Sequence, residues 1–505
     1  MLTKVKTATL MGVEGYPVTV ETDLHNGMPG LNIVGLADTT IRESCQRIKP
    51  AIMNCGYHFP REKVTVNLVP AGRPKEGSHF DLPIALGIMM LSEEVVEMED
   101  TAFLGEVSLD GTINPVKGVL PLAICLRQAG VKNLVLPKAN AEEAAVLEDI
   151  RILPVGTLME AADHATGVKI IDPYIRKKTG RTKRHEVDFA QVLGQESTKR
   201  AILIGAAGNH GMLMMGGPGC GKTMMARRIP TILPELTYEE KLEITGIYSV
   251  AGLLSDSRPV IEERPFRSPH HSITAPGLIG GGVKPRPGEL SLAHRGVLFL
   301  DELGEFDSRV IDSMRQPVEE GVVHIIRNNE EVIFPTQIML VIAANPCKCG
   351  NLWDDRKMCT CTRAQLLSHR RKLMGPFADR VDMHLKVSPV PRERLMEARQ
   401  AGTGMSSASM RQIVEETRER QRHRYRNTGY KDNGTLDDRG IERFCKLDAV
   451  CRTMMNEAYD KLGLTMRGYN KICKMARTIA DVEGSEGIKE IHVAEALLYR
   501  VDLGE

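Results

Sequence analysis

The sequence predicts a multidomain α/β protein built around a central parallel sheet with crossover helices. Between residues 188 and 390, apolar strand-like runs, Gly-rich turns and helical stretches follow one another repeatedly, which is typical of such a sheet. Before this part short strands alternate with helices, and after Pro391 only helical periodicity remains. A chain of 505 residues is also too long for one ordinary core and, at roughly 150 residues per domain, suggests about three domains.

These patterns divide the chain into successive segments. Residues 1–168 are expected to form an α+β domain, with a strand at 63–68 and a helix at 82–91. Residues 169–187 form a basic linker between domains. The favoured interpretation is that its charges are simply solvated, and the alternative is a second contact with nucleic-acid phosphates. Six basic residues crowd into its stretch 176–184: Arg176, Lys177, Lys178, Arg181, Lys183 and Arg184. Residues 188–390 carry the sheet, and residues 391–505 form a helical domain with helices at 410–425, 441–461, 470–482 and 491–499.

Composition excludes several classes of protein. Apolar residues make up 42% and charged residues 26%, an ordinary globular balance. The net charge of +1 gives no overall attraction to nucleic acid or membrane, so that any such partner must be held by local patches. We see no secretory signal and no apolar run long enough to span a bilayer. The 11 cysteines are then expected as reduced thiols or metal ligands in a cytoplasmic protein without a membrane partner.

The most specific motif is a Gly-rich loop between an apolar run and a helical stretch. It matches G-x-x-x-x-G-K-[ST] in the expected strand–loop–helix context. Glycines let backbone N–H groups wrap a polyphosphate, and the helix N-terminus adds a favourable dipole. Lys222 is expected to reach the β- and γ-phosphates, and the hydroxyl of Thr223 is expected to bind Mg²⁺. The predicted nucleotide-binding residues are Gly216, Gly217, Pro218, Gly219, Cys220, Gly221, Lys222 and Thr223.

An acidic pair supports this prediction. The apolar run at 297–300 ends in Asp301 and Glu302. At the carboxyl end of a strand, Asp301 is placed to hold Mg²⁺ and Glu302 to polarise the attacking water. Together with the loop about eighty residues upstream, the pair predicts a protein that binds ATP with Mg²⁺ and hydrolyses it.

Three further polar residues are candidates for the same reaction. Asn345 ends an apolar run and can orient the water, although opening the turn before Pro346 is the alternative. Arg380 is suited to the γ-phosphate of a neighbouring subunit, although its flanking acids favour a local ion pair. Arg467, in the helical tail, is a candidate to reach the same phosphates.

Three segments follow one another ahead of the acidic pair: FRSPHHS at 266–272, LIGGG at 278–282 and PGELSLAHRGVLFLDE at 287–302. In their sequence and order they resemble the magnesium-chelatase-like AAA+ ATPases of the YifB/ComM group. The resemblance implies a Lon-protease-like N-terminal domain, an AAA+ module and a C-terminal helical lid. It also implies that Asn345 is the sensor-1 residue, Arg380 the arginine finger and Arg467 the sensor-2 residue. A finger that acts on a neighbour implies a homo-oligomeric ring, expected as a hexamer.

The resemblance further implies a β-hairpin before sensor 1. Strand-like residues 322–327 and 331–334 flank the sequence Asn328-Asn329-Glu330, whose residue types suit a hairpin turn. In related DNA motors this hairpin points into the pore of the ring. Arg327, near its tip, is therefore a candidate DNA-phosphate contact, and an arginine that merely faces solvent is the equal alternative.

Two other segments leave their roles open. The pair His270 and His271 is a hallmark of the family; hydrogen bonding within the loop is favoured over metal or DNA binding. The helix at 411–426 is rich in arginine, and a solvated face with i,i+4 pairs is favoured over a DNA contact.

Four cysteines between Asn345 and Arg380 have the spacing C-x-C-x₉-C-x-C. Thiolates in two close pairs can complete a tetrahedral Zn²⁺ site, and four protein ligands would make it structural. The alternative is four reduced thiols in a loop. The candidate ligands are Cys347, Cys349, Cys359 and Cys361.

The N-terminal domain resembles the Lon peptidase domain around 74–81 and 105–111. In active members a Ser is activated by a Lys. Alignment on the two segments places His79 at the Ser position and Leu120 at the Lys position, although Ser78 and Lys117 lie close by. The resemblance therefore implies a peptidase fold that has lost its dyad and serves as a binding or ring-organising platform.

Several functions fit these residues. We expect an ATPase motor that remodels single-stranded or branched DNA, such as the branch-migrating helicases of this family. A chelatase-type motor subunit for metal insertion is the first alternative, and the Lon-like domain, which such subunits lack, argues against it. A nucleotide-dependent scaffold with another client is the second, and the intact Glu302 argues against that.

Overall fold

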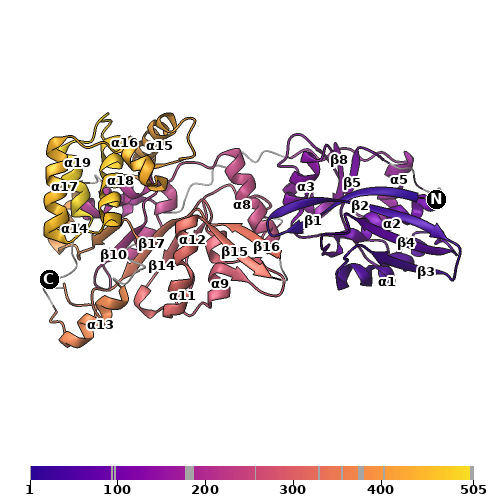
Figure 1. Ribbon diagram of the computed structural model, residues 1–505, viewed down its shortest axis with the longest axis horizontal. Helices are drawn as coiled ribbons and strands as arrows, with labels where there is room; N and C mark the ends of the chain where they lie inside the picture. The colour runs from indigo at the N-terminus through magenta and orange to yellow at the C-terminus, as the bar shows by residue number, and fades with distance from the viewer. Residues whose placement is uncertain are drawn as a thin grey trace.

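The computed structural model describes residues 2–92, 95, 98–176, 187–255, 257–327, 330–353, 357–373, 380–401 and 404–500. Figure 1 shows the N-terminal domain at one end of the long axis, the central sheet in the middle and the C-terminal helices at the other end. Among the described helices, none is both long and apolar enough to cross a membrane.

A seven-stranded sheet forms the N-terminal domain, in the order β3-β4-β2-β1-β5-β8-β9. Its strands are β1 (Leu2–Met11), β2 (Glu14–His25), β3 (Gly30–Val34), β4 (Lys63–Val69), β5 (Thr101–Phe103), β8 (Asn133–Pro137) and β9 (Arg151–Val155). Buried and exposed residues alternate along β4, as expected for a strand with one face on the core. The helices are α1 (Thr39–Asn54), α2 (Asp81–Leu91), α3 (Val119–Gln128), α4 (Ala141–Ala144) and α5 (Leu158–Thr166). The predicted strand at 63–68 and helix at 82–91 correspond to β4 and α2.

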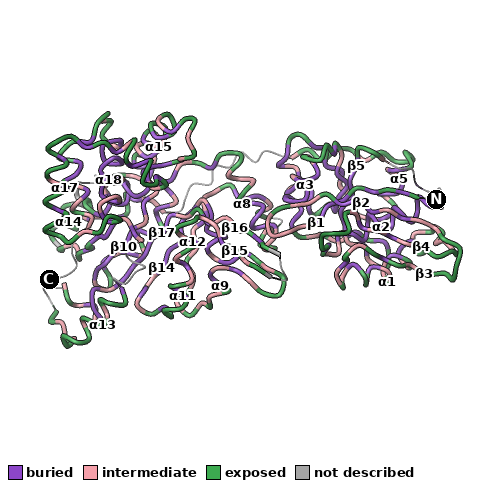
Figure 2. Tube along the Cα trace, viewed as in Figure 1, coloured by how far each residue is buried: buried purple, intermediate pink, exposed green. Residues whose placement is uncertain are grey.

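Short elements complete this domain. They are η1 (Ser78–Phe80), η2 (Lys138–Asn140) and the pair β6 (Glu106–Val107) and β7 (Ile113–Asn114). Every residue of α2 is buried, because both faces of this apolar helix are covered. Figure 2 shows the buried trace concentrated in α2 and the strands beside it.

The central domain contains a five-stranded sheet whose strand pairs are all parallel, in the order β11-β14-β17-β10-β18. The strands are β11 (Phe266–Arg267), β14 (Val297–Leu300), β17 (Met339–Ala344), β10 (Met212–Met215) and β18 (Met383–Lys386). β10, β14 and β17 are buried along their whole length, as is typical of parallel strands covered on both faces. Because these strands run in one direction, their carboxyl ends meet at one edge of the sheet.

Helices and hairpins surround this sheet. The helical elements are η3 (Phe189–Gln191), α6 (Glu196–Gly208), α7 (Lys222–Ala226), η4 (Ile229–Ile232), α8 (Tyr238–Ala251), α9 (Ala275–Ile279), α10 (Glu289–Leu292), η5 (Leu303–Glu305), α11 (Ser308–Ser313), α12 (Arg315–Glu320) and α13 (Arg363–Leu373). One hairpin pairs β12 (Gly280–Gly281) with β13 (Arg286–Pro287). The other, predicted from its turn chemistry, pairs β15 (Val322–Arg327) with β16 (Glu330–Pro335).

The C-terminal segment is helical, as predicted. Its elements are α14 (Arg392–Ala401), α15 (Ser407–Arg424), η7 (Asn433–Thr435), α16 (Asp438–Phe444), α17 (Ala449–Leu462), α18 (Met466–Val482) and α19 (Glu490–Leu498). It shares one hydrophobic core with the sheet, in which Ile479 and Met475 lie with Val341 and Phe299. The helical lid therefore rests directly on the central domain.

The single helix predicted over 441–461 was wrong. The chain forms α16 and α17 with a break between them. The carboxylate of Asp448 accepts the backbone N–H of Cys451 at 2.8 Å, so Asp448 caps a new helix. Apolar periodicity continues across the break, and only the capping residue marks it.

The N-terminal domain is joined to the central domain by hydrogen bonds and ion pairs. Glu143 on α4 is buried and accepts the hydroxyl of Ser249 on α8. Lys284, in the turn after β12, pairs with Asp38 at 2.9 Å. Of the basic residues crowded at 176–184, Arg176 is described, and it pairs with Glu142 at 3.3 Å. The others, Lys177, Lys178, Arg181, Lys183 and Arg184, lie outside the described residues.

Candidate functional site

The Gly-rich loop lies at the carboxyl end of β10 and runs into α7. Gly219 and Gly221 have φ angles of +77° and +87°, a left-handed backbone that glycine adopts without strain. At Gly216 a Cβ atom would lie 2.2 Å from the carbonyl oxygen of Val387. The glycines are therefore required both by the turn of the loop and by its close contact with the segment after β18.

Lys222, at the first position of α7, is buried, with 9% of its surface exposed. Its Nζ donates to the carbonyls of Gly216 at 2.5 Å and Gly217 at 2.9 Å, and to Oδ1 of Asn345 at 3.3 Å. Burial lowers the pKa of this ammonium group. The structure thus brings Lys222 to Asn345, at the end of β17, as the motif spacing predicts.

The acidic pair faces the same loop. Thr223 donates its hydroxyl to Oδ2 of Asp301 at 2.8 Å, so the two predicted Mg²⁺ ligands are neighbours. Glu302 follows with an exposed side chain and a φ angle of 54°. A left-handed backbone is uncommon for a residue other than glycine and often marks a functional site. Lys222, Thr223, Asp301, Glu302 and Asn345 therefore gather at one edge of the sheet.

Arg380 and Arg467 do not join this group. Both contact Glu319 on α12: Nε of Arg380 lies 3.1 Å from Oε1, and a guanidinium nitrogen of Arg467 lies 2.9 Å from the same oxygen. Glu319 was not found by sequence reasoning, because it is 61 residues from Arg380 and belongs to no motif. Arg380 thus forms an ion pair with Glu319, and the neighbouring Asp379 lies outside the described residues.

The two arginines lie toward the amino ends of the strands. Asp382, two residues after Arg380, bonds through its N–H to Gly211, immediately before β10. β10 spans four residues at about 3.3 Å each, so the phosphate loop is at the opposite edge. The prediction that Arg467 reaches the phosphates therefore does not hold within one chain.

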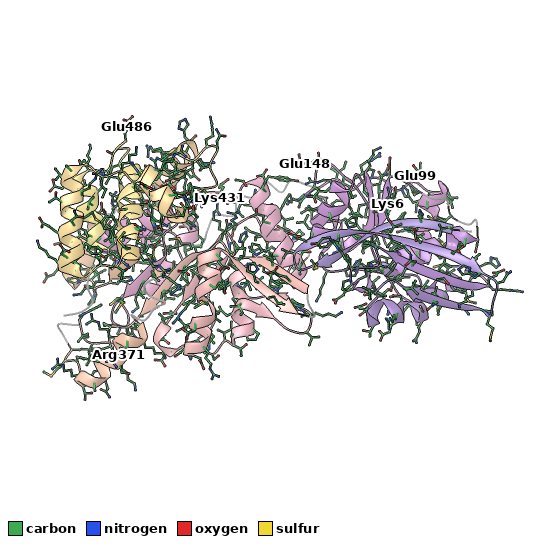
Figure 3. All side chains as sticks on the ribbon, in the orientation of Figure 1. Lys6, Glu99, Glu148, Arg371, Lys431 and Glu486 are labelled. Carbon is green, nitrogen blue, oxygen red and sulfur yellow. The ribbon has the colours of Figure 1, made fainter. Side chains whose placement is uncertain are left out.

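A cleft of about 1490 Å³ opens at this amino edge, between the sheet and the helical lid. Arg380, Arg467 and Glu319 line it together with Lys431, which is labelled in Figure 3. Charged side chains of both signs dominate the lining, so the cleft suits a polar partner surface better than an apolar ligand.

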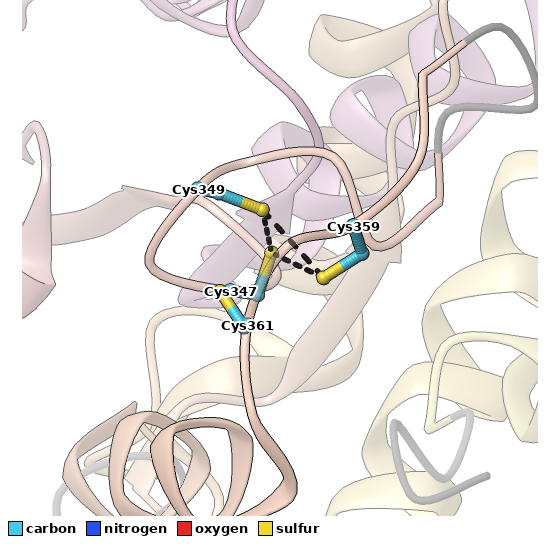
Figure 4. Close-up of side chains that lie close together, drawn as sticks. All are labelled: Cys347, Cys349, Cys359 and Cys361. Atoms are coloured by element: carbon cyan, nitrogen blue, oxygen red, sulfur yellow. Dashed lines mark hydrogen bonds between the residues drawn. The ribbon is translucent and has the colours of Figure 1, made fainter.

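The four cysteines gather as a cluster between the phosphate loop and α13 (Figure 4). Sγ of Cys347 lies 3.4 Å from that of Cys349 and 3.7 Å from that of Cys359, and the Cys349–Cys359 separation is 3.6 Å. All four sulfur atoms, including that of Cys361, lie within 4.8 Å of one another. Four sulfur atoms at about 2.3 Å from a tetrahedral Zn²⁺ would be about 3.8 Å apart.

The cluster therefore fits a metal far better than disulfides, which need sulfur atoms about 2.05 Å apart. Backbone N–H groups of Asn351 and Thr360 lower the pKa of the Cys349 thiol, which favours the thiolate form that binds metals. The donor set is one that Zn²⁺ prefers.

His369 on α13 is a second residue that sequence reasoning missed. Its Nε2 lies 2.9 Å from the carbonyl oxygen of Asn345, so the ring donates to the backbone of the predicted sensor. A Cβ on Gly304, two residues after Glu302, would lie 3.4 Å from the same ring. No signal in the sequence links His369 to Asn345, since a histidine in a basic helix is unremarkable there.

The remaining candidates differ in how far the structure describes them. The strand position of Arg327 opposite Glu330 is described, but its side chain is not. His270 forms a hydrogen bond with the hydroxyl of Ser272 at 2.8 Å, and its ring is tilted against that of His271 with the centroids 4.0 Å apart. These contacts agree with the favoured hydrogen-bonded loop.

The arginine-rich helix corresponds to α15, and its arginines bind their own chain. Arg418 pairs with Asp432 at 2.8 Å, and Arg424 pairs with the buried carboxylate of Asp481. Arg411 donates to the carbonyl of Thr231 at 2.9 Å. At these three positions the favoured interpretation as a solvated face was wrong, because the side chains hold the lid together and fix it to the central domain. Arg420 does form the expected kind of i,i+4 pair, with Glu416 at 3.9 Å.

Both positions of the peptidase dyad are buried. His79 is 5% exposed and bonds through Nε2 to the carbonyl of Ala8 at 2.9 Å, and burial lowers its pKa to about 4. Leu120 is fully buried in α3. Lys117 lies against the central domain, where a Cβ on Gly252 would be 2.8 Å from its Cε. The resemblance to the Lon peptidase domain stays a prediction.

The phosphate loop, the acidic pair and the lid on a parallel sheet define a P-loop protein of the AAA+ class. Family models described as "Magnesium chelatase, subunit ChlI", "Subunit ChlI of Mg-chelatase" and "Magnesium chelatase, subunit ChlI C-terminal" match residues 188–395, 20–140 and 404–500. The chain belongs to the magnesium-chelatase-like AAA+ family, in the group of ComM and YifB. Membership implies ATP and Mg²⁺ as the ligands of this site.

Two relatives align over almost the whole chain. Competence protein ComM of Haemophilus influenzae is 38% identical over 496 residues, which cover 97% of this chain and 96% of that protein. The uncharacterized protein YifB of Escherichia coli is 38% identical over 502 residues, with 99% and 97% covered. The magnesium-chelatase 38 kDa subunit of Rhodobacter capsulatus is 25% identical over 186 residues, which cover 33% of this chain and 53% of that subunit. Similarity to ComM and YifB thus includes the N-terminal domain.

Proposed function

We propose that this protein is an ATP-hydrolysing motor that works as a ring and remodels single-stranded or branched DNA. The observation that carries ATP hydrolysis is the group formed by Lys222, Thr223, Asp301, Glu302 and Asn345 at one edge of the sheet. These side chains come from the ends of two neighbouring strands, β14 and β17, and from helix α7, which is the arrangement that phosphoryl transfer to water requires.

Each residue has one task in this proposal. Lys222 moves its ammonium group from the loop carbonyls to the β- and γ-phosphates of ATP, and the loop N–H groups bind the same oxygens. Thr223 and Asp301 hold Mg²⁺, which neutralises charge that develops on the phosphates. Glu302 accepts a proton from the attacking water, and Asn345 orients that water.

The positions of Arg380 and Arg467 support a ring. Both lie at the edge opposite their own phosphate loop, so they serve a phosphate only when a second copy places its loop in the cleft that they line. Closed rings of identical subunits arise from such head-to-tail contacts. We propose a hexamer in which both arginines act on the neighbouring subunit's ATP.

DNA is proposed as the client on two grounds. A relative that aligns over 97% of this chain is named as a competence protein. The β15–β16 hairpin is the element that would carry Arg327 to a phosphate in the pore. A branch-migrating helicase of the ComM type is the activity that we favour.

Magnesium chelation is the second candidate, because three family models named for a chelatase subunit match the chain. Under this hypothesis a tetrapyrrole-binding partner, and not DNA, would stimulate ATP turnover. The cysteine cluster is proposed to hold structural Zn²⁺ in either case, since four protein ligands leave no open position.

The test is ATP turnover by the purified full chain, with and without single-stranded and branched DNA, at low and moderate salt. A Glu302→Gln variant should bind ATP with unchanged affinity but turn it over at least about a hundredfold more slowly. Arg327→Ala should reduce the increment that DNA causes, whereas Arg309→Ala, a 92% exposed arginine on α11, should not.

The outcomes separate the hypotheses. If DNA neither binds nor accelerates turnover at low salt, where phosphate contacts are strongest, the DNA proposal fails and the ATPase stands. If ATP binds without turnover by the unmodified chain, the protein is a nucleotide-dependent scaffold and the motor proposal fails.

A further inference from the structure

We infer that the four-cysteine loop and α13 form a metal-dependent brace that positions three parts of the ATP site at once, with His369 as a positioning residue for Asn345. This inference rests on the proposed ATPase function. It goes beyond a structural zinc site, because it assigns to the bound metal an effect on nucleotide binding and on turnover.

The first contact of the brace is with the phosphate loop. Gly350, between the cysteine pairs, is buried and has a φ angle of +83°. A Cβ there would lie 2.8 Å from Cδ of Pro218, and a Cβ on Gly217 would lie 3.1 Å from the carbonyl oxygen of Gly350. The two loops therefore touch backbone to backbone. A shift of the cysteine loop would move the carbonyls and N–H groups that receive the phosphates.

The second contact is with Asn345. This residue is only two positions before the buried Cys347, and its carbonyl accepts from His369, which lies beyond the last cysteine. The sensor is therefore held from both sides: by the chain that leads to the first ligand, and by a helix that follows the fourth. A metal that joins the two cysteine pairs would fix both anchors relative to each other.

The third contact is with the segment that follows Glu302. Lys372 on α13 donates to the carbonyl of Gly304 in η5, and the ring of His369 packs against the same glycine. Because Glu302 has a left-handed backbone, the turn after it must be held in place by its neighbours. α13 is one of these neighbours.

In the part of the brace that the structure describes, 347–353 and 357–373, little apolar packing is present. Leu373 is the buried residue of α13, and Trp353 is only partly buried against the central core. The ammonium group of Lys386 lies 5.1 Å from the centroid of the Trp353 ring. Zn²⁺ bound by the four thiolates would supply the cross-link that this coreless segment lacks.

The experiment compares five variants of the full chain, purified under reducing conditions, with the unmodified protein. For each, the zinc content, the Kd of a fluorescent ATP analogue and the ATP turnover are measured. Cys359→Ser removes one ligand and should lose the metal and weaken ATP binding about tenfold or more. Cys45→Ser, a half-buried thiol of the N-terminal domain, is the matched control and should keep all three properties.

Gly350→Ala and His369→Phe keep all four thiols. Gly350→Ala should retain about one zinc per chain yet weaken ATP binding, because the new methyl group must displace Pro218. His369→Phe should retain zinc and ATP affinity but lower kcat, and His369→Gln, which can again donate to the carbonyl of Asn345, should restore part of it.

Three results would overturn the brace. One is an unmodified chain that binds and hydrolyses ATP but contains no zinc. Another is loss of zinc from Cys359→Ser, or by chelation, with unchanged Kd and kcat. The third is a Gly350→Ala variant with unaltered ATP binding. Absence of ATP binding and turnover in the unmodified chain would instead refute the proposed function itself. Recovery of ATP binding when Zn²⁺ is returned to chelated protein would support the brace.

Discussion

Glu319 binds both arginines that we assign to the neighbouring subunit's ATP. Its carboxylate is 39% exposed and contacts Arg380 and Arg467 at 3.1 and 2.9 Å. Each guanidinium group must leave this carboxylate to reach a phosphate, so Glu319 competes with ring closure. Both ion pairs of Glu319 are partly exposed, so each holds its arginine in place with only a modest free energy.

A Glu319→Gln variant should therefore turn ATP over faster than the unmodified chain where rings are incompletely assembled. Loss of exposed ion pairs of this kind should raise the rate of ATP turnover about two- to fivefold. The measurement is ATP turnover as a function of protein concentration. Glu320→Gln is the matched control, since that carboxylate accepts from Gln316 at 2.9 Å. Lower turnover of Glu319→Gln would mean that Glu319 orients the arginines for the reaction and does not restrain them.

Residues whose positions follow from strand ends could be predicted, whereas those joined by tertiary contacts could not. Thr223 and Asp301 are 78 residues apart, yet the motif places both at the carboxyl edge of a parallel sheet, where their side chains must meet. Glu319 and His369 act through partners that no periodicity or motif connects to them. Arg467 was placed correctly on the lid, but the edge of the sheet that it faces depends on how the lid packs.

Among the elements, the junction of η1 and α2 should respond to acid. His79 in η1 is buried, and burial lowers its pKa from 6.5 to about 4. The unfolded chain therefore takes up the proton first as the pH falls through 6.5, and the folded state loses stability down to about pH 4. From pH 7.5 to pH 5 the protonation of His79 should lower the free energy of unfolding by about 2 kcal/mol.

Replacement by Gln removes the titration. His79→Gln should be less stable than the unmodified chain at pH 7.5, because the hydrogen bond to Ala8 is altered, but should lose less stability on acidification. Calorimetric unfolding of both chains at pH 7.5 and 5 isolates the histidine, since all other groups are shared. If the stability of both chains fell equally between pH 7.5 and 5, His79 would take up its proton in the folded chain as readily as in the unfolded chain, and the prediction would be wrong.

Element types were predicted better than element limits. The buried runs of β10, β14 and β17 and the turn of the β15–β16 hairpin were recognisable from composition. The break between α16 and α17 was missed, since one capping aspartate outweighs continuing periodicity there. The arginines of α15 were misjudged because their partners Asp432 and Asp481 lie on later elements.

At the scale of the whole molecule, the N-terminal domain contacts both hairpins of the central domain. Lys284, between β12 and β13, pairs with Asp38 and Glu76. A Cβ on Gly12, in the turn between β1 and β2, would lie 2.6 Å from a methyl carbon of Val332 on β16. Movement of either hairpin during the ATP cycle must therefore be accommodated by the N-terminal domain, which suits a platform that organises the ring.

The ring itself can be tested by mixing two inactive chains. Arg380→Ala retains its own phosphate loop, and Glu302→Gln retains its own arginines, so a mixed interface can bring an intact loop to an intact arginine. In randomly mixed closed rings about a quarter of the interfaces are of this kind, and turnover should recover to about a quarter of the unmodified value. Glu302→Gln mixed with Lys222→Ala is the control: both defects lie at the same edge of the subunit, and no mixed interface contains a complete site. Absence of recovery in the first mixture, with mixed rings verified by cross-linking, would mean that Arg380 does not act on the neighbouring subunit.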